Sequence, residues 1–202
     1  MNTRVVDAGD VSAAIEILKG GGLVAFPTDT VYGLGALAFD NRAIESIYTA
    51  KNRPAEKGIP ILFADADEMD KVAVNIPDMV YIFAARFWPG PLTCVVPGRP
   101  TLPPAVSTTS TVAIRIPDHI QARALLRAAG PLAVTSANIS GGENPCTADE
   151  VFAQLNGRIP LILDGGRTPG GTPSTLVDCT GSQPVILRQG PIPLESLLIV
   201  LG

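Results

Sequence analysis

Apolar residues recur along this chain at two spacings, and each spacing predicts a different kind of element. Val11, Ala14 and Leu18 lie three or four residues apart and predict one face of a helix, which Asp10 is expected to cap. By the same pattern, further helices are expected after a cap at Asn41, through 69–73, through 80–87, from Asp118, after a cap at Thr147 and from about Leu194. Short unbroken apolar runs instead predict buried strands, at 23–26, 59–63, 92–96, 112–116, 132–134, 161–163, 175–177 and 185–187.

The order of these elements predicts a single domain over residues 1–202. Helices alternate with strands through most of the chain, and no internal repeat, charge block or linker-like change of composition divides it. Such alternation favours helices layered on a sheet, in which helical crossovers make some strand pairs parallel. Only turns are expected between the last three strands, so these should pair antiparallel. The expected fold class is therefore α+β, a layered mixed parallel and antiparallel sheet flanked by helices.

Composition excludes several classes of protein. Hydrophobic residues make up 46% of the 202 residues and charged residues 17%, which is enough apolar mass for a packed core. Fifteen lysines and arginines against 19 acidic residues give a net charge of -4, which argues against a broad basic surface for nucleic acid. The three cysteines have no CxxC spacing, so we expect neither a disulfide framework nor a thiolate zinc site. Because no signal-peptide pattern and no apolar run of about 18 residues occurs, we expect a cytoplasmic protein without membrane contact.

The segment 27–35, PTDTVYGLG, is the first candidate for a binding loop. It directly follows a predicted buried strand, which is where ligand-binding loops of layered sheets lie. The alternative is a polar turn between strands, with glycines that supply positive φ. Gly33, Gly35 and Ala38 imitate a dinucleotide fingerprint, but no predicted helix opens on these glycines, so we do not expect a nicotinamide cofactor.

Positive charge gathers where the helix from Asn41 is expected to end. Lys51, Arg53 and Lys57 fall within seven residues of one another. Cations at a helix C-terminus can simply stabilise the helix dipole. In a chain of net negative charge they also suit a phosphate-bearing ligand, with arginine as a bidentate fork and lysine as a point charge. On either interpretation, we expect neither Lys51 nor Arg53 in the core.

Polar residues also interrupt or follow the apolar strands. Arg115 lies within the strand VAIRI and must pair with an acid, reach solvent or face a polar cavity, where a ligand carboxylate would suit it. Arg188 repeats this pattern, and the segment 135–142, TSANISGG, either presents neutral hydroxyl and amide groups or forms an Asx or Ser turn. Ser136 is in no GxSxG elbow, and His119, the only histidine, is expected at a helix start. Neither a hydrolase triad nor a metal site is therefore predicted.

Six motifs follow one another in an order that resembles the YrdC-like family of L-threonylcarbamoyladenylate synthases. They are PTDTVYGL at 27–34, KNRPAEKG at 51–58, AIRIPDH at 113–119, TSANISG at 135–141, PSTLVD at 173–178 and ILRQG at 186–190. The resemblance runs from about residue 10 to the C-terminus, and we expect a stand-alone catalytic domain without the additional C-terminal domain of longer relatives. It implies a twisted mixed sheet with a large open cavity of positive lining. It also implies that L-threonine, bicarbonate or CO2, and ATP are converted to threonylcarbamoyladenylate and pyrophosphate.

The resemblance further implies roles for individual residues. The catalytic pairs of the family fall on Lys51 and Arg53 and on Ser136 and Asn138. Threonine is expected near Thr30, Arg115 and Ser174. The nucleotide, with Mg2+ held mainly by its phosphates, is expected near Arg53, Lys57, Thr111, Asn138, Asn144 and Arg188. The adenylate would pass, through a transient contact, to a separate transferase complex that modifies adenosine 37 of ANN-decoding tRNAs.

Two departures from the family pattern affect the expected threonine contacts. Lys57 and Gly58 stand where some relatives have Asn-Pro, and apolar residues around Leu62 stand where some have a histidine. The motifs offer no evident general base, so we expect catalysis by positioning and charge compensation. Two other functions stay open. One is an RNA-binding module of the same fold that makes no adenylate, and the other is a paralogue with a different carbamoyl donor or acceptor.

Overall fold

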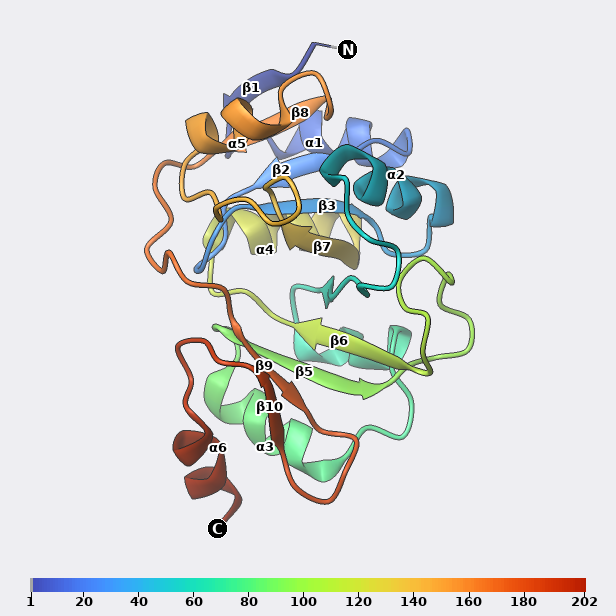
Figure 1. Ribbon diagram of the computed structural model, residues 1–202, viewed down its shortest axis with the longest axis vertical. Helices are drawn as coiled ribbons and strands as arrows, with labels where there is room; N and C mark the ends of the chain where they lie inside the picture. The colour runs from blue at the N-terminus through green and yellow to red at the C-terminus, as the bar shows by residue number, and fades with distance from the viewer. Residues whose placement is uncertain (1) are drawn as a thin grey trace.

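The structure, a computed structural model, describes residues 2–202. Within these residues ten strands form one sheet, in the order β1-β8-β2-β3-β7-β4-β6-β5-β9-β10 (Figure 1). The strands are β1 (Arg4–Asp7), β2 (Val24–Phe26), β3 (Gly33–Leu37), β4 (Ile61–Leu62), β5 (Leu92–Pro97), β6 (Thr111–Arg115), β7 (Leu132–Ser136), β8 (Leu161–Asp164), β9 (Thr175–Asp178) and β10 (Val185–Arg188). The helices are α1 (Val11–Lys19), α2 (Asn41–Lys51), the 3-10 helix η1 (Ala66–Lys71), α3 (Asp78–Phe87), α4 (Ile120–Ala129), α5 (Ala148–Leu155) and α6 (Leu194–Leu201). Across the same residues, no helix combines the length and the apolar character that a membrane span requires.

Strand pairing is both parallel and antiparallel. The pairs β1–β8, β8–β2, β4–β6 and β5–β9 are parallel. The pairs β2–β3, β3–β7, β7–β4, β6–β5 and β9–β10 are antiparallel. The predicted fold class, α+β with a mixed sheet, is therefore confirmed.

The antiparallel pairing predicted for the last three strands is wrong for β8. This strand lies between β1 and β2 and is parallel to both, whereas β9 is parallel to β5 and only β10 is antiparallel to β9. The cause is the connection 165–174, which is not a tight turn. It runs along one side of the molecule and carries the chain from one end of the sheet to the other (Figure 1).

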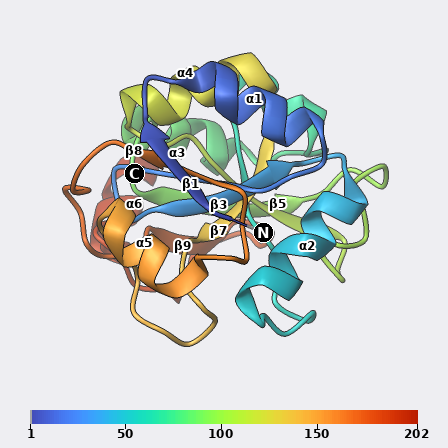
Figure 2. The ribbon, with the colours of Figure 1, turned by 90° about the horizontal axis from the view of Figure 1, so that it is seen from above.

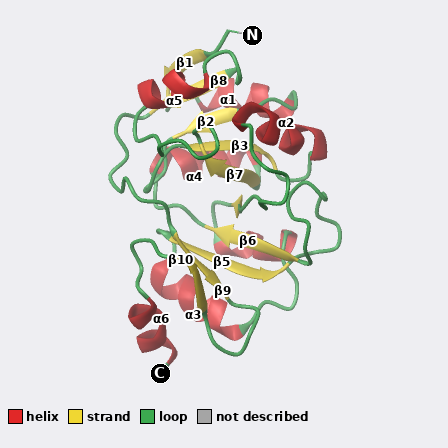
Figure 3. Ribbon diagram, in the orientation of Figure 1, coloured by secondary structure: helices red, strands yellow, loops and turns green. Residues whose placement is uncertain are grey.

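Alternation along the strands divides the core between the two faces of the sheet. Leu161 and Leu163 of β8 pack with residues of α1 and α4, whereas Ile162 between them packs in the cluster that contains α2 and α5. Seen from above, α1 and α4 cover one face and α2 and α5 cover the other (Figure 2). The helices α3 and α6 lie at the opposite end, beside β5, β9 and β10 (Figure 3). Apolar burial on both faces fixes the positions of the strand ends from which the functional residues project.

Two helices differ slightly from their predicted starts. Asp40, and not the expected Asn41, caps α2 and accepts a hydrogen bond from the amide of Ala43. The helix expected from Asp118 is α4, which begins at Ile120 and is capped by His119. A cap residue has extended backbone and turns its side chain back onto the first helical turn, and both residues do this. His119 is thus at a helix start, as expected, whereas the caps expected for α1 and α5 are confirmed at their predicted positions.

The strand β3 was not predicted, because two glycines interrupt its apolar pattern. Residues 27–32 do connect the paired strands β2 and β3, but neither Gly33 nor Gly35 has positive φ, so that part of the turn prediction is wrong. A Cβ at Gly33 would lie 2.7 Å from Cγ1 of Val134, and one at Gly35 would lie 3.0 Å from the Phe26 ring. The glycines therefore leave room for neighbouring side chains on the sheet, and they do not serve as hinges.

Candidate functional site

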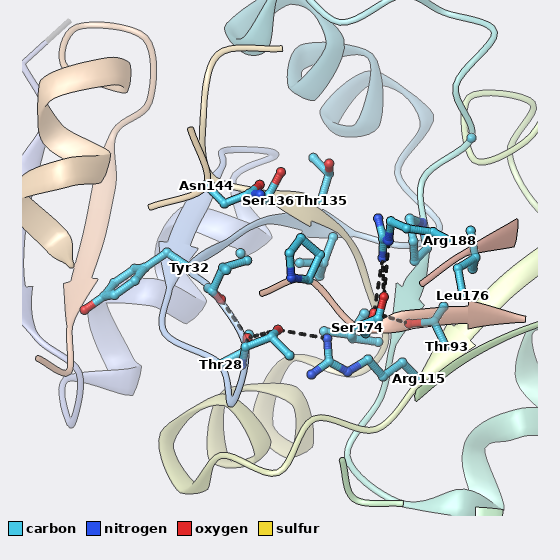
Figure 4. A pocket seen from close by; sticks show the side chains of 18 of the residues that line it. Thr28, Tyr32, Thr93, Arg115, Thr135, Ser136, Asn144, Ser174, Leu176 and Arg188 are labelled. Carbon is cyan, nitrogen blue, oxygen red and sulfur yellow. Dashed lines mark hydrogen bonds between the residues drawn. The ribbon is translucent and has the colours of Figure 1, made fainter. Parts of the chain in front are cut away.

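A pocket of about 220 Å³ opens at the centre of the sheet, where β4 is only two residues long. Its lining comes from strand ends and loops that are far apart in the sequence. Seven of the residues predicted for the site line it: Thr30, Arg53, Arg115, Ser136, Asn144, Ser174 and Arg188. In Figure 4, Ser136 and Asn144 lie on one side of the pocket, and Arg115, Ser174 and Arg188 lie on the other.

Arg115, at the end of β6, is buried, and two of the three alternatives considered for it, pairing with an acid and facing a polar cavity, are found together. Its Nη2 forms an ion pair with Oδ1 of Asp29, its Nη1 donates to Oγ1 of Thr30 at 3.1 Å, and its Nε donates to the carbonyl of Gly90 at 3.0 Å. A guanidinium has five N–H donors, so these three bonds leave two for a ligand. The structural ion pair and the polar cavity therefore exist together, and the ion pair holds the fork in place at the pocket.

Arg188, at the end of β10, is tied to the segment before β9. Its Nε and Nη2 both donate to the carbonyl of Ser174, at 3.2 and 2.9 Å. The Ser174 hydroxyl is 2.7 Å from that of Thr93 on the neighbouring strand β5 (Figure 4). A second terminal nitrogen of Arg188 is left for the pocket, and the two hydroxyls form a small polar shelf beside it.

Arg53 approaches from the loop after α2. Its Nε donates to the carbonyl of Lys57 at 3.2 Å, and its Nη2 donates to that of Gly58 at 2.8 Å. These bonds close the loop 53–58 on itself and direct the remaining terminal nitrogen towards the pocket, whose lining includes both Arg53 and Gly58.

The three arginines are close enough to raise the positive potential in the pocket. Burial lowers the pKa of each, with smaller contributions from the charge of Arg53 on Arg188 and the charge of Arg188 on Arg115. The side chains nevertheless stay protonated, because arginine does not lose its proton in proteins. A chain of net charge -4 thus concentrates repelling cations in one cavity, which an anionic ligand would stabilise.

The prediction that Lys51 lies outside the core is wrong. The side chain is in the core, with 1% of the residue exposed, because the ammonium finds three buried acceptors there. It donates to the carbonyls of Ser136 and Asn138, and to Oδ1 of Asn138 at 3.3 Å. Burial, followed by the charge of Arg53, lowers the pKa of Lys51 to about 7. Neither Lys51 nor Asn138 lines the pocket, and both lie behind the Ser136 wall.

Two further predicted residues lie outside the pocket. The side chain of Lys57 is on the exposed loop, although its carbonyl supports Arg53. The hydroxyl of Thr111 is 2.9 Å from that of Thr109, at the start of β6 and away from Arg115. Contacts of these two residues with a nucleotide stay predictions.

Three residues that support the site were given no individual role from the sequence, although two of them, Thr28 and Asp29, lie in the predicted binding loop 27–35. Thr28 accepts a hydrogen bond from the amide of Thr30 and orders the loop, Asp29 holds Arg115, and Thr93 holds Ser174. Thr93 carries the same sequence pattern that drew attention to Arg115, since it is a polar residue inside an apolar strand. No local sequence signal marks Asp29, because its role comes from its contact with Arg115, which is 86 residues away in the chain.

The oxygen atoms that line the pocket suit a metal ion that enters already bound to a phosphate-bearing ligand. Across residues 2–202, no group of three or more His, Cys, Asp or Glu side chains could hold a metal ion. The described pocket lining provides hydroxyl and amide oxygens but no carboxylate. Mg2+ prefers oxygen ligands, retains several waters and is commonly held by substrate phosphates. The residues present therefore fit an ion bound mainly by a nucleotide.

The chain is similar to proteins of known family. Residues 16–190 match the Sua5/YciO/YrdC family model, whose description is "Telomere recombination". The chain is 41% identical over 199 residues to the threonylcarbamoyl-AMP synthase of Pyrococcus abyssi (strain GE5 / Orsay), and 42% identical over 195 residues to that of Bacillus subtilis (strain 168). These alignments cover 98% and 95% of this chain, but 58% and 56% of the two relatives.

A solved structure shows the same likeness in three dimensions. The crystal structure of P. abyssi Sua5 complexed with L-threonine superposes on the chain with a TM-score of 0.93 at 40% sequence identity. The superposition covers 100% of this chain and 60% of that one. The chain therefore spans less than two thirds of the length of these relatives.

Proposed function

The chain belongs to the Sua5/YciO/YrdC family, and on that premise we propose that it is a threonylcarbamoyl-AMP synthase. The substrates would be L-threonine, bicarbonate or CO2, and ATP, and the products threonylcarbamoyl-AMP and pyrophosphate. Two relatives at about 40% identity carry this name, which supports the proposal. The activity is proposed for a chain that corresponds to only part of their length.

The observation that carries the proposal is the convergence of Arg53, Arg115 and Arg188 on one pocket. In the proposed reaction, negative charge is present on the amino-acid carboxylate, the carbamate, the α-phosphoryl group and the leaving pyrophosphate. Fixed cations in a partly water-excluded site stabilise such charge more effectively than water does. Three separately anchored guanidinium groups can compensate negative charge at several points of the bound substrates.

Threonine fits best against Arg115. The two unused N–H donors of Arg115 would bind the carboxylate, and the hydroxyls of Thr30 and Ser174 would bind the polar groups of the amino acid. The L-threonine complex of the similar P. abyssi protein supports an amino-acid site in this fold. Leu62, one of the apolar residues in the region where some relatives have a histidine, gives this part of the pocket an apolar wall.

The chemistry requires two bond-forming steps. The neutral amine of threonine attacks the carbon of CO2, a C–N bond forms, and the amine gives up a proton. An oxygen of the resulting carbamate then attacks the α-phosphorus of ATP, and the bond to the bridging oxygen breaks to release pyrophosphate. The pocket contributes by holding three substrates together and by balancing the accumulating charge. Mg2+ bound to the phosphates would supply further neutralisation of the nucleotide.

No side chain of the described pocket lining is suited to be a general base. The hydroxyl of Tyr32 points away from the pocket and donates to the carbonyl of Gly166 at 2.7 Å (Figure 4). Burial raises its pKa to about 12, so it stays protonated. The nearby carboxylate of Asp29 is engaged by Arg115. We propose that the proton leaves with bicarbonate or water, and that the protein acts by positioning and electrostatics.

The product would be used in tRNA modification. A mixed carbamic–phosphoric anhydride is reactive, so a second enzyme must take it up soon after its release. The proposed acceptor is a separate transferase complex that places the threonylcarbamoyl group on adenosine 37 of tRNAs that decode ANN codons, with transient contact between the two proteins.

Pyrophosphate release with each substrate omitted in turn tests the proposed function. The complete mixture should release pyrophosphate, and omission of threonine or of bicarbonate should reduce release to the background without enzyme. Equal release without threonine would contradict the proposal. Strongly salt-dependent RNA binding without ATP turnover would favour an RNA-binding module instead. Adenylate formation from carbamoyl phosphate in place of bicarbonate and threonine would favour a paralogue with another donor.

A further inference from the structure

Lys51 belongs to a motif that suggests contact with substrate, but its surroundings oppose such contact. It is the last residue of α2, and only 1% of it is exposed. An ammonium group has three N–H donors and no acceptor. The carbonyl of Ser136, the carbonyl of Asn138 and the Oδ1 of Asn138 match those three donors one for one. No donor of Lys51 is left for a ligand.

The backbone of Lys51 also binds the segment 136–142. The carbonyl of Lys51 accepts a hydrogen bond of 2.8 Å from the amide of Ser140. Asn138, whose Oδ1 receives the lysine, also accepts from the hydroxyl of Ser136 and donates through Nδ2 to the carbonyls of Ile139 and Gly142 at 2.9 and 2.7 Å. The side chain and backbone of Lys51 thus bind the end of β7 and the loop that follows it.

Lys51 is two residues before Arg53, which lines the pocket. Asn52 ends α2 in the left-handed conformation, and the amide of Arg53 donates to the carbonyl of Tyr48 at 2.9 Å. Arg53 is therefore fixed to the last turn of α2, two residues from Lys51. Lys51 therefore joins the two parts: its ammonium binds the pocket wall that carries Ser136, and its backbone continues into the loop that carries Arg53.

We propose that Lys51 is a positioning residue, which fixes the Ser136 wall against Arg53 and does not touch substrate. The proposal rests on the proposed function for the reaction that this positioning serves. Removing the ammonium would take that donor from the buried carbonyls of Ser136 and Asn138 and leave Oδ1 of Asn138 with only the Ser136 hydroxyl, and a buried acceptor that loses its donor is destabilising. A direct contact with phosphate would require the same loss in the native enzyme, whereas the observed geometry satisfies all three acceptors.

The test compares Lys51→Met, Asn138→Ala and the double variant, with Lys19→Met as the matched control. Lys19 is an exposed lysine in the last turn of another helix, α1. Hydrogen exchange is measured over 136–142, and threonine-dependent pyrophosphate release is measured per folded molecule. If Lys51 acts through Asn138, the fold-losses of kcat/KM in the two single variants do not multiply in the double variant.

We expect the Ser140 and Gly142 amides to exchange at least about tenfold faster in Lys51→Met and as in wild type in Lys19→Met. We expect kcat/KM to fall by about tenfold or more in each single variant at the pocket, and the double variant to match the more severe single one within about threefold. Losses that multiply would indicate direct contact with substrate and would overturn the proposal. Faster exchange with unchanged kcat/KM would reduce Lys51 to a structural residue and would also overturn it.

A second lysine variant keeps the test decisive if Lys51→Met is unfolded at the assay temperature. Lys51→Arg retains positive charge, but its planar guanidinium cannot aim three donors as the ammonium does. We expect the same loss of protection and turnover, and wild-type behaviour of Lys51→Arg would contradict a positioning role. If the wild-type enzyme itself releases no threonine-dependent pyrophosphate, the proposed function fails, whereas hydrogen exchange still decides whether Lys51 holds this segment.

Discussion

At the scale of the residue, each pocket arginine uses some of its donors to hold itself in place and keeps others free. Arg115 is anchored by Asp29, Thr30 and Gly90, and Arg188 by the carbonyl of Ser174. Such anchoring reduces the entropy that a long side chain loses when it binds a ligand. It also explains why a charge as costly to bury as that of Arg115 is stable beside the pocket, since its partner carboxylate is within reach.

Replacement of Arg115 by lysine separates its charge from its shape. The variant Arg115→Lys would keep a positive charge near Asp29 but could not present two parallel donors to a carboxylate. The loss of one charge-assisted hydrogen bond, about 1.5–3 kcal/mol, predicts that the KM for threonine rises by roughly 10- to 100-fold. Steady-state kinetics with threonine varied at saturating ATP measure this. An unchanged KM for threonine would place the amino-acid site elsewhere, and the KM for ATP is the internal control.

At the scale of the element, regular apolar patterns predicted most helices and strands, and local exceptions account for the misses. The pattern did not predict β3 because Gly33 and Gly35 stand where packed side chains would be expected. It did not predict β1 because that strand lies at the sheet edge with mostly exposed side chains. Lys51 was placed outside the core because its type is usually exposed, and only the three acceptors supplied by a distant segment explain its burial.

Gly33→Ala tests whether β3 depends on the absence of a side chain. The new Cβ would lie 2.7 Å from Cγ1 of Val134, so the Val134 side chain or one of the two strands must shift. Overpacking of this kind costs about 1–3 kcal/mol of unfolding free energy. Urea unfolding should show that loss, and the double variant Gly33→Ala/Val134→Ala should recover part of it. Equal stability of Gly33→Ala and wild type would show that the close approach does not constrain the fold.

The ion pairs of Asp65 predict a pH-dependent link between the segment after β4 and α4. The guanidinium groups of Arg127 and Arg123 hold the pKa of Asp65 at about 2, below its ordinary value of 3.8. The ion pairs therefore stabilise the folded state fully above about pH 4, and this contribution is lost as the pH falls towards about 2. The effect is small, because the side chains are partly or largely exposed. Urea midpoints should fall less steeply over this range in Asp65→Asn than in wild type, and identical slopes would contradict the link.

At the scale of the whole molecule, the site depends on topology more than on any one motif. The motifs that line the pocket lie at strand ends, but their meeting depends on pairs such as β5–β9 and β4–β6, which join segments far apart in the chain. Composition predicted the class of protein but not the local field. A net charge of -4 says nothing about where the positive charges gather, and here three arginines share one cavity.

Under the proposed function, this cavity joins threonine, a one-carbon unit and an adenylate in one product. Mass spectrometry of the products formed from L-threonine, 13C-labelled bicarbonate and unlabelled ATP tests it directly. We expect threonylcarbamoyl-AMP that carries one 13C atom, formed in equal amount to the pyrophosphate released. An adenylate without the label, or AMP alone, would show that the proposed function is wrong.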